Sequence, residues 1–362
     1  MASAQQPKRS PVICHGHSRP IVEVNYSVIT PEGYFLASAS KDGKPMLRFG
    51  ESGDWYGTFE GHKGAVWSCV LDKGALKCAT GSGDFSARVW DACSGTQLHQ
   101  FTHDHIVRSV NFSHSSALLA TGGMEKVIRI YDLARPDQAP QQLAGAPSGI
   151  RSLTWLQGDQ TLLCSFTDKP GVGVYDMRSL SQVQMMQTAA PVTSVELSFD
   201  AQYLTMTDGR SVRFMEANGL QLLKELTVPR TCESASWAPS KRRFVTGGED
   251  MWVYVYDYDT GLEIECNKGH HGPVHTIRWA PTYETYASGS EDGTIRIWSL
   301  DGSSEGGGAA AGNPPVTPPP SRVTARPQAC ALASVTCGWP GSLGGAISHT
   351  KRRSAAAQDR AL

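Results

Sequence analysis

Short apolar segments alternate with turns along most of the chain. In one stretch, the apolar segment Val66–Leu71 is followed by alternating segments at 76–80 and 86–90. Turns rich in Gly, Ser and Asp follow these two segments, at 81–84 and 91–95. Runs of four to six β-prone residues separated by such turns predict antiparallel strands. Before residue 300 we find no segment of helical period and useful length.

The same unit recurs seven times between residues 12 and 300. Its first marker is an aromatic residue near the end of a strand segment, at Phe49, Trp90, Tyr131, Tyr175, Phe214, Tyr256 and Trp298. Its second marker is a Gly-His pair or a degenerate copy, at Gly16-His17, Gly61-His62, His103, Gly269-His270 and near Ala146, Thr188 and Val228. Both markers share a period of about 42 residues, the length of a propeller blade. We therefore predict an all-β fold, a seven-bladed β-propeller of four-stranded antiparallel blades over residues 12–300.

These repeats resemble those of the WD-repeat family. The seventh unit contains Gly269-His270 and then Tyr-Ala-Ser-Gly-Ser-Glu-Asp-Gly-Thr-Ile-Arg-Ile-Trp at 286–298. The second contains Gly61-His62 and then Arg-Val-Trp-Asp at 88–91. The resemblance implies that Val12-Ile-Cys14 forms the outer strand of the last blade. The start of the chain would then close the ring and cover an open sheet edge.

Composition and charge exclude several classes of protein. The chain has 362 residues, 40% of them hydrophobic and 19% charged, which is enough apolar material for a sizeable core. A net charge of −1 argues against a general nucleic-acid or membrane-surface binder. The sequence shows no long apolar run and no apolar N-terminal stretch, so we expect no membrane insertion and no secretory signal. Its 9 cysteines form no Cys-x-x-Cys pair, which favours a reducing compartment.

One set of four residues recurs in the second and seventh repeats. These quartets are His62, Thr80, Asp84 and Trp90, and His270, Ser288, Asp292 and Trp298. They contain the residue types of a hydrolase triad, but a hydrolase needs a single nucleophile beside an oxyanion hole. In the WD-repeat family these positions form a buried chain of hydrogen bonds from Asp through His and the hydroxyl to the Trp indole. We therefore predict a structural network and no catalytic residues.

Other chemical motifs are weak. His103-Asp104-His105 and His270-His271 with His275 offer metal-ligand types, but the repeat already uses one histidine of each group, so we predict no metal site. The sequence has no P-loop, dinucleotide fingerprint or kinase signature. We expect no cofactor and no enzymatic activity.

Three repeats depart from the pattern. The first has Pro45 inside a strand segment and Phe49 in place of Trp, which predicts a strand that is irregular or paired on one side only. The fourth contains Lys169-Pro-Gly171, and the fifth has Thr188-Ala-Ala-Pro191 at the Gly-His position. We expect the fourth and fifth blades to lack the full polar network and to depend on apolar packing.

Without visible chemistry, function is expected to come from the surface. The Gly-His loop and the Asp turn lie at one rim of each blade, so neighbouring residues should line one mouth of the central channel. The repeat alignment places there Val22, Trp67, Arg108, Arg151, Thr193, Glu233 and His275, with Lys41, Gly83, Glu249 and Glu291 before the turn Asp. Exposed Trp and Arg anchor protein interfaces, and mixed charge indicates a protein patch rather than a phosphate track. The alternative is that Trp67 is buried beneath a neighbouring loop.

Five segments carry a closer resemblance than the generic repeat. They are 30–36, 41–48, 53–67, 256–261 and 289–296, and Lys-Asp-Gly-Lys-Pro-Met-Leu-Arg at 41–48 is the specific part. They are similar to the family of serine/threonine kinase receptor-associated proteins, also called UNR-interacting proteins. The resemblance implies a non-catalytic adaptor, cytoplasmic and nuclear, that works as a single subunit of a hetero-complex.

The resemblance also implies partners. These are components of the survival-of-motor-neuron complex, which loads Sm proteins onto spliceosomal small nuclear RNAs, and UNR, with RNA contacted indirectly. Transforming-growth-factor-β receptors with an inhibitory Smad, whose signal the family dampens, are also implied. One alternative is the propeller subunit of translation initiation factor three, which shares Gly-Thr-x-x-Gly-His-x-Gly-Ala-Val-Trp at 57–67 but lacks the Lys-Pro-Met-Leu-Arg strand at 44–48. A propeller enzyme is the alternative from another class, and the lack of a unique polar cluster argues against it.

The two ends of the chain differ from the repeats. We expect residues 1–11 to be a flexible N-terminus and residues 301–362, rich in Gly, Pro and Ala, to be a disordered low-complexity tail. The resembled family ends in an acidic, partly aromatic tail, whereas this one carries Lys351-Arg-Arg353, which we interpret as a solvated charge cluster rather than a nuclear import signal. The departure indicates an alternative or mis-assembled terminus.

Overall fold

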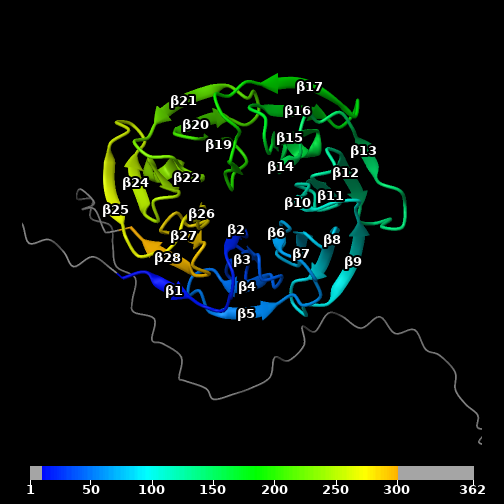
Figure 1. The fold of residues 1–362 in the computed structure, drawn as a ribbon, viewed down its shortest axis with the longest axis horizontal. Coiled ribbons are helices and arrows are strands. Elements are labelled where there is room, and N and C mark those ends of the chain that lie inside the picture. Colours follow the sequence, from blue (N-terminus) through cyan, green and yellow to red (C-terminus); the bar gives the residue numbers. More distant parts are fainter. Residues whose placement is uncertain (1–9, 301–362) are drawn as a thin grey trace, which may run out of the picture. The chain divides into compact units, whose positions relative to one another are not determined.

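Seven four-stranded antiparallel sheets stand around a central channel in the computed structural model (Figure 1). The structure describes residues 10–300, and the predicted seven-bladed β-propeller is confirmed. Nearly all of the predicted N-terminal segment and the whole predicted tail, with Lys351-Arg-Arg353, lie outside the described residues. Within the described range the helical segments are two short 3-10 turns, Gln157–Asp159 and Pro239–Lys241, and no helix has the length and apolarity to cross a membrane.

The blades are numbered in chain order, and each runs from the channel outward. The innermost strands are β2 (Ile21–Tyr26), β6 (Val66–Leu71), β10 (Val107–Phe112), β14 (Ile150–Leu156), β18 (Ser194–Leu197), β22 (Ser234–Ala238) and β26 (Val274–Trp279). The second strands are β3 (Phe35–Ser40), β7 (Lys77–Ser82), β11 (Leu118–Gly123), β15 (Thr161–Phe166), β19 (Tyr203–Asp208), β23 (Arg243–Gly247) and β27 (Thr285–Ser290). The third strands are β4 (Met46–Phe49), β8 (Ser86–Asp91), β12 (Ile128–Asp132), β16 (Val172–Asp176), β20 (Ser211–Glu216), β24 (Val253–Asp257) and β28 (Ile295–Ser299). The outer strands are β5 (Trp55–Thr58), β9 (Gln97–Thr102), β13 (Gln141–Leu143), β17 (Ser181–Met186), β21 (Leu222–Thr227), β25 (Glu263–Asn267) and β1 (Val12–Cys14).

The hydrophobic core is divided into seven clusters, each between two neighbouring blades. The second strands are buried along nearly their whole length, because neighbouring blades cover both of their faces. Between the seventh and first blades, Ile295 and Ile297 pack with Ile21 and Leu36. This approach is close enough to require glycine in β27, since a Cβ on Gly289 would lie 2.7 Å from Cγ2 of Ile21. Each blade therefore buries its apolar side chains only while both neighbours are in place.

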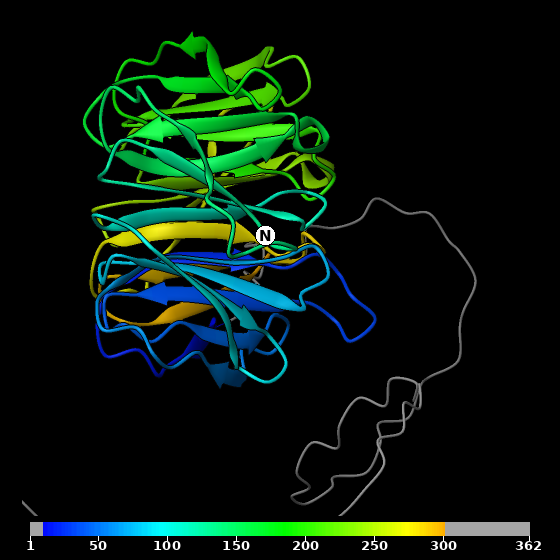
Figure 2. The same cartoon turned by 90° about the vertical axis from the view of Figure 1, so that its right-hand side faces the viewer.

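Strand β1 completes the seventh blade. It pairs antiparallel with β28, so that Val12 faces Ile297 and Cys14 faces Ile295 (Figure 1). Viewed edge-on, the blades are stacked side by side, and their strands run between the two faces of the ring (Figure 2). The closing strand joins the two ends of the described chain in one sheet, as the family resemblance implied.

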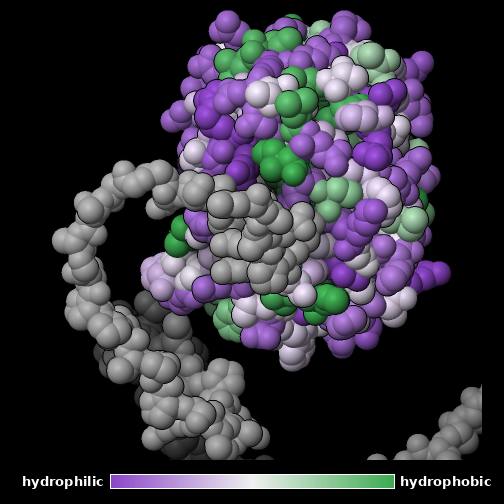
Figure 3. All heavy atoms as spheres, turned by 90° about the vertical axis from the view of Figure 1, so that its left-hand side faces the viewer, coloured by the Kyte–Doolittle hydropathy of each residue, from purple (hydrophilic) through white to green (hydrophobic). Residues whose placement is uncertain are grey.

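The outer wall seen from the side of β25 is mostly hydrophilic, with separate hydrophobic groups (Figure 3). Exposed apolar side chains of the outer strands include Val183, Leu222 and Ile264, and Leu262 lies just before β25. Isolated exposed apolar residues of this kind are normal on protein surfaces.

We expect removal of residues 1–16 to open the ring, because it deletes β1 and exposes the side of β28 that it covers. The melting temperature should fall by roughly 10 °C or more in a thermal unfolding scan. A chain that lacks residues 301–362 is the control and should melt within about 2 °C of the full chain. Equal melting of the two truncated chains would contradict closure by β1.

Candidate functional site

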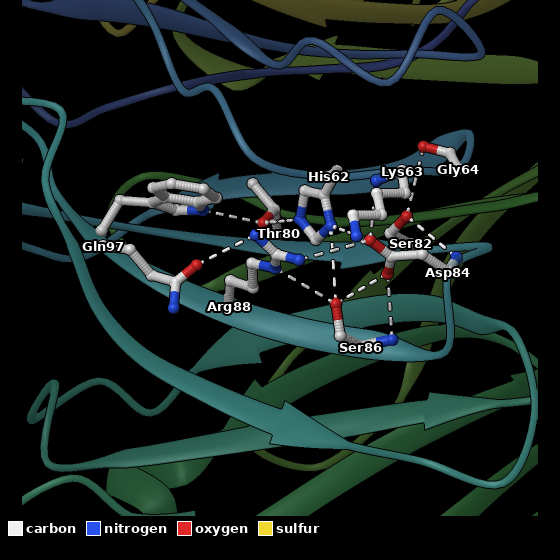
Figure 4. A network of polar contacts seen from close by, with 10 residues as sticks. His62, Lys63, Gly64, Thr80, Ser82, Asp84, Ser86, Arg88 and Gln97 are labelled. Carbon is white, nitrogen blue, oxygen red and sulfur yellow. Dashed lines mark hydrogen bonds and ion pairs between the residues drawn. The ribbon is translucent and has the colours of Figure 1, made fainter. Parts of the chain in front are cut away.

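The second blade contains a chain of hydrogen bonds that runs from its rim into its core (Figure 4). His62 Nδ1 lies 2.9 Å from Asp84 Oδ2, and His62 Nε2 lies 2.7 Å from Thr80 Oγ1. The Trp90 indole donates to the same hydroxyl at 2.8 Å, and the Lys63 amide donates to Asp84 at 3.0 Å. Burial alone would raise the pKa of Asp84, but the hydrogen bonds from His62 and its neighbours outweigh burial and hold this pKa well below its ordinary range.

This geometry resembles a hydrolase triad, but its hydroxyl is sealed inside the blade. When the His62 proton lies on Nδ1 and faces the Asp84 carboxylate, Nε2 accepts from the Thr80 hydroxyl. Thr80 also accepts from Trp90, and its side chain is fully buried. A nucleophile must reach a substrate carbonyl beside an oxyanion hole. The Thr80 hydroxyl instead satisfies two buried partners and thereby helps to fix the positions of the strands.

The seventh blade repeats the arrangement. His270 Nδ1 lies 3.0 Å from Asp292 and Nε2 lies 2.7 Å from the fully buried Ser288, which accepts from Trp298 at 2.8 Å. Burial lowers the pKa of His270. Burial alone would raise the pKa of Asp292, but the hydrogen bonds that this carboxylate accepts outweigh burial and lower its pKa to about 2. The structure thus brings both predicted quartets together.

The first blade has three members of a quartet and an arginine in place of the fourth. His17 lies 2.8 Å from Asp42 and 2.8 Å from Ser38. The strand register pairs Leu36 with Arg48, as it pairs Cys78 with Trp90 in the second blade. The prediction that Phe49 replaces the tryptophan is therefore wrong by one residue, because the aromatic residue lies one position beyond the strand position that faces the core.

The strand near Pro45 is predicted to be irregular or paired on one side only, and it is irregular, because its ladder with β5 shifts register between Leu47 and Arg48. Pro45 lies just before β4, which begins at Met46 and pairs on both sides, with β3 and with β5. The missing amide donor of Pro45 is therefore outside the ladder.

In the fourth blade Tyr175 stands at the tryptophan position and packs in the cluster between the third and fourth blades. Its buried hydroxyl has no hydrogen-bond partner among the described residues.

His103 belongs to the third blade's own polar contacts. Its Nδ1 lies 3.3 Å from Glu125, and burial, with Glu125 opposing, lowers the pKa of His103 to about 4. The ring of His105 instead lies 5.5 Å from that of Phe85. Among residues 10–300, no group of three or more His, Cys, Asp or Glu side chains is placed to hold a metal ion.

We call the face that carries the turns between second and third strands the Asp face, after Asp42, Asp84 and Asp292. The channel mouth on this face is a cavity of about 300 Å³. Its lining includes the predicted Val22, Lys41, Trp67, Arg108, Arg151, Thr193, Glu233 and His275. Of the other predicted residues, Glu291 contacts two lining residues, whereas Glu249 is exposed and outside the lining.

β-bulges explain how these side chains reach the mouth. The ladder between first and second strands skips one residue in five blades, and the skipped residues are Val22, Trp67, Arg108, Arg151 and His275. A bulge leaves its extra residue out of the ladder and changes the direction of its side chain. The same local device therefore presents a different side chain in each of these blades.

Most charges at the mouth are paired. Arg151 lies 3.1 Å from Glu233. Glu291 lies 2.6 Å from His275 and 3.5 Å from Lys41, and these contacts lower its pKa. These pairs neutralise the side of the mouth away from the second and third blades.

Trp67 and Arg108 form a separate pair. Trp67 is half-buried, and the Arg108 guanidinium carbon lies 4.4 Å from the centre of its ring. Trp67 is therefore neither fully exposed nor fully buried, because the Arg108 side chain covers part of its ring. This is a cation–π contact, and the indole stays partly accessible from the mouth.

Below the mouth, Arg278 and Glu196 lie in the channel wall. Arg278 donates to the hydroxyls of Ser194 at 3.2 Å and Ser234 at 3.0 Å, and its Nε lies 3.9 Å from Glu196. Burial raises the pKa of Glu196 to about 7, although Arg278 opposes this. These residues were not predicted, since the repeat markers do not identify positions along the inner strands.

Phe85 is a further residue of the Asp face that the sequence analysis missed. It follows Asp84 at a turn position that Gly43 and Gly293 occupy in the first and seventh blades. A comparison of the turns by position would have singled it out, because an aromatic residue replaces glycine there.

Comparison with known proteins gives a match to one family model and matches to whole proteins. The family model described as WD domain, G-beta repeat matches residues 53–91, 95–132 and 263–299. The chain is 47% identical to the serine-threonine kinase receptor-associated protein of Gallus gallus, over 80% of this chain and 83% of that protein. The protein of the same name from Dictyostelium discoideum is 43% identical over 80% of this chain and 99% of its own length. Subunit I of eukaryotic translation initiation factor 3 from Drosophila grimshawi is more distant, at 30% identity over 80% of this chain and 97% of that protein.

Replacement of Asp84 or Asp292 by alanine should destabilise the fold by about 1–3 kcal/mol, because each leaves a buried histidine without its partner. Urea unfolding at neutral pH measures the loss. Asp137→Ala is the control, since Asp137 is exposed, and it should change stability by less than about 0.5 kcal/mol. A quartet variant as stable as the control would show that the network contributes nothing to folding.

Glu196 should make stability depend on pH. Its pKa is raised from an ordinary 4.5 to about 7 in the folded chain, so between these values only the folded state keeps the proton. Stability therefore falls as pH rises through this window, by up to about 3 kcal/mol. Glu196→Gln keeps an acceptor for Ser236 and should remove this fall. Urea midpoints at pH 5.5 and 8 test this, and parallel changes in both chains would refute it.

Proposed function

Since the chain belongs to the family of the serine-threonine kinase receptor-associated protein, we propose that it is a WD-repeat scaffold that binds other proteins and catalyses no reaction. The observation that carries this proposal is the channel mouth on the Asp face. Bulges present a half-buried Trp and several charged side chains there, whereas the two triad-like quartets are sealed inside blades. Trp and Arg in partly covered positions are the residue types that dominate protein interfaces.

The finer proposal follows the family. The chain acts as one subunit of the survival-of-motor-neuron complex in small nuclear ribonucleoprotein assembly, with UNR as a partner and RNA contacted through other subunits. It also associates with transforming-growth-factor-β receptors and an inhibitory Smad and dampens their signal. Both roles place it in the cytoplasm and the nucleus. The relatives' name supports association with a receptor kinase.

The propeller itself is the proposed binding unit. The match to the Dictyostelium relative spans 290 residues and covers 99% of that protein. A relative of that size has room for the seven blades and little more, which supports a function located in the ring rather than in a tail.

The test is capture of partners by the tagged full chain from cell extract, identified by mass spectrometry. We expect components of the survival-of-motor-neuron complex and a receptor of the transforming-growth-factor-β class. Trp67→Ala should reduce their recovery by about tenfold, because it removes the anchor of the mouth.

Trp55→Ala is the matched control, since Trp55 is 61% exposed on outer strand β5, and it should recover partners as the unmodified chain does. Recovery of initiation-factor subunits alone would favour the second family instead. Equal recovery by both variants would place binding on another surface.

A further inference from the structure

The turn of the second blade on the Asp face carries a strained and exposed aromatic residue. Phe85 has a φ of 66°, whereas the equivalent turn positions of the first and seventh blades hold Gly43 and Gly293 at φ of 79° and 77°. Positive φ is unfavourable for a residue with a Cβ, and most unfavourable for a bulky one. The Phe85 side chain is nevertheless 44% exposed. Burial of the side chain within this chain therefore offsets little of the backbone strain. Residues with strained backbone angles concentrate at functional sites.

Phe85 belongs to a strip of side chains that crosses from the second blade to the third. Its ring centre lies 5.5 Å from that of His105. Two residues before it, Gly83 is close to the Trp67 indole, since a Cβ there would lie 3.6 Å from Nε1. Trp67 in turn contacts Arg108. We call Phe85, His105, Trp67 and Arg108 the aromatic strip.

Arg108 ends the strip and differs from the other cations of the mouth. It is half-buried, and among the described residues it forms no ion pair with a carboxylate, whereas Arg151 and Lys41 each have one. Burial, together with the charge of Arg151, lowers the pKa of Arg108, although the charge of Asp168 opposes this. A partly desolvated cation of this kind is stabilised by an incoming anion.

The anion is better supplied by a protein than by a nucleic acid. Acidic side chains stand around the strip, with Asp84 before Phe85, Glu125 on the next turn and Glu233 across the mouth. Each of the three is paired with an arginine, namely Arg88, Arg129 and Arg151. The surface around the strip therefore offers no row of free cations for successive phosphates, whereas the charge of Arg108 can take a single carboxylate.

We propose that the aromatic strip binds a segment of another protein in which a carboxylate side chain lies a few residues from a large apolar side chain. The carboxylate pairs with Arg108, and the apolar side chain covers Phe85 and His105. This inference rests on the proposed scaffold function and names the chemistry of the partner segment.

The sixth blade provides a matched control within the same chain. Met251 occupies the equivalent turn position, with a φ of 68° and a side chain that is 39% exposed. The nearby Arg230 is paired with Asp250 at 3.3 Å and Glu263 at 3.6 Å. The sixth blade thus has the strained apolar residue beside an arginine whose charge is already paired, and it lies across the ring from β6–β9 (Figure 1).

The test uses the full chain as bait for a phage library of random peptides of about twelve residues. We expect the enriched peptides to contain Asp or Glu within about four residues of an aromatic or large aliphatic residue. The affinity of a synthetic copy of the most enriched peptide is then measured for the unmodified chain and for Phe85→Gly, Arg108→Gln and Met251→Gly. The first two should bind at least about tenfold more weakly, and Met251→Gly should bind within about twofold.

Thermal melting separates binding from folding. Phe85→Gly relieves the positive φ and should melt at or above the temperature of the unmodified chain, so its loss of affinity would not come from unfolding. Enriched peptides without acidic residues, no enrichment, or equal affinity of Phe85→Gly and Met251→Gly would overturn the proposal. If the two strip variants still capture the cellular partners, the scaffold function stands and the assignment of the strip fails. If the unmodified chain captures no partner, the scaffold function fails irrespective of the peptide result.

Discussion

The structure depends on the burial of apolar side chains between blades rather than within them. All seven hydrophobic clusters are shared by two neighbours, and each second strand is covered on both faces. A ring built this way cannot lose one blade without exposing the faces of two others. The demands of this packing are seen in β27, where Gly289 leaves room for Ile21 of the next blade.

The polar quartets and the bulges determine the surface at the rim and mouth of this packed ring. In the second and seventh blades the quartet ties the turn Asp to the core through His, hydroxyl and Trp, so the rim is held by buried hydrogen bonds. In five blades, a bulge leaves one residue of the innermost strand out of the ladder, at the channel mouth. A bulge changes the direction of a side chain whatever the residue type. The residues at the mouth can therefore differ between blades while the fold stays the same. Trp67 and Arg108, adjacent at this mouth, illustrate how such variation creates a specific contact.

The sequence was informative wherever a property repeats. The period of the markers predicted the number of blades, the quartets and the residues of the mouth, because one rule applies to every copy. It was less informative where a single residue decides the outcome. Phe49 was placed at a core position because aromatic residues mark that position in other repeats, although the register puts Arg48 there. Whether Arg108 has an acidic partner depends on contacts between blades, and no pattern along one strand contains that information.

Arg48 lies in the first blade, within the segment 41–48 that carries the specific part of the resemblance, and it contacts the end of the closing strand. Its guanidinium donates to the Gly53 carbonyl at 3.1 Å and to the carbonyl of His15, the residue that follows β1. Gly53 itself is so close to the closing strand that a Cβ there would lie 2.5 Å from the sulfur of Cys14. Burial lowers the pKa of Arg48, and the backbone carbonyls provide the acceptors that a buried cation requires. A tryptophan at this position could donate only one hydrogen bond, whereas arginine joins β1 and the first blade through two. The departure from the repeat at residue 48 is therefore part of the mechanism that closes the ring.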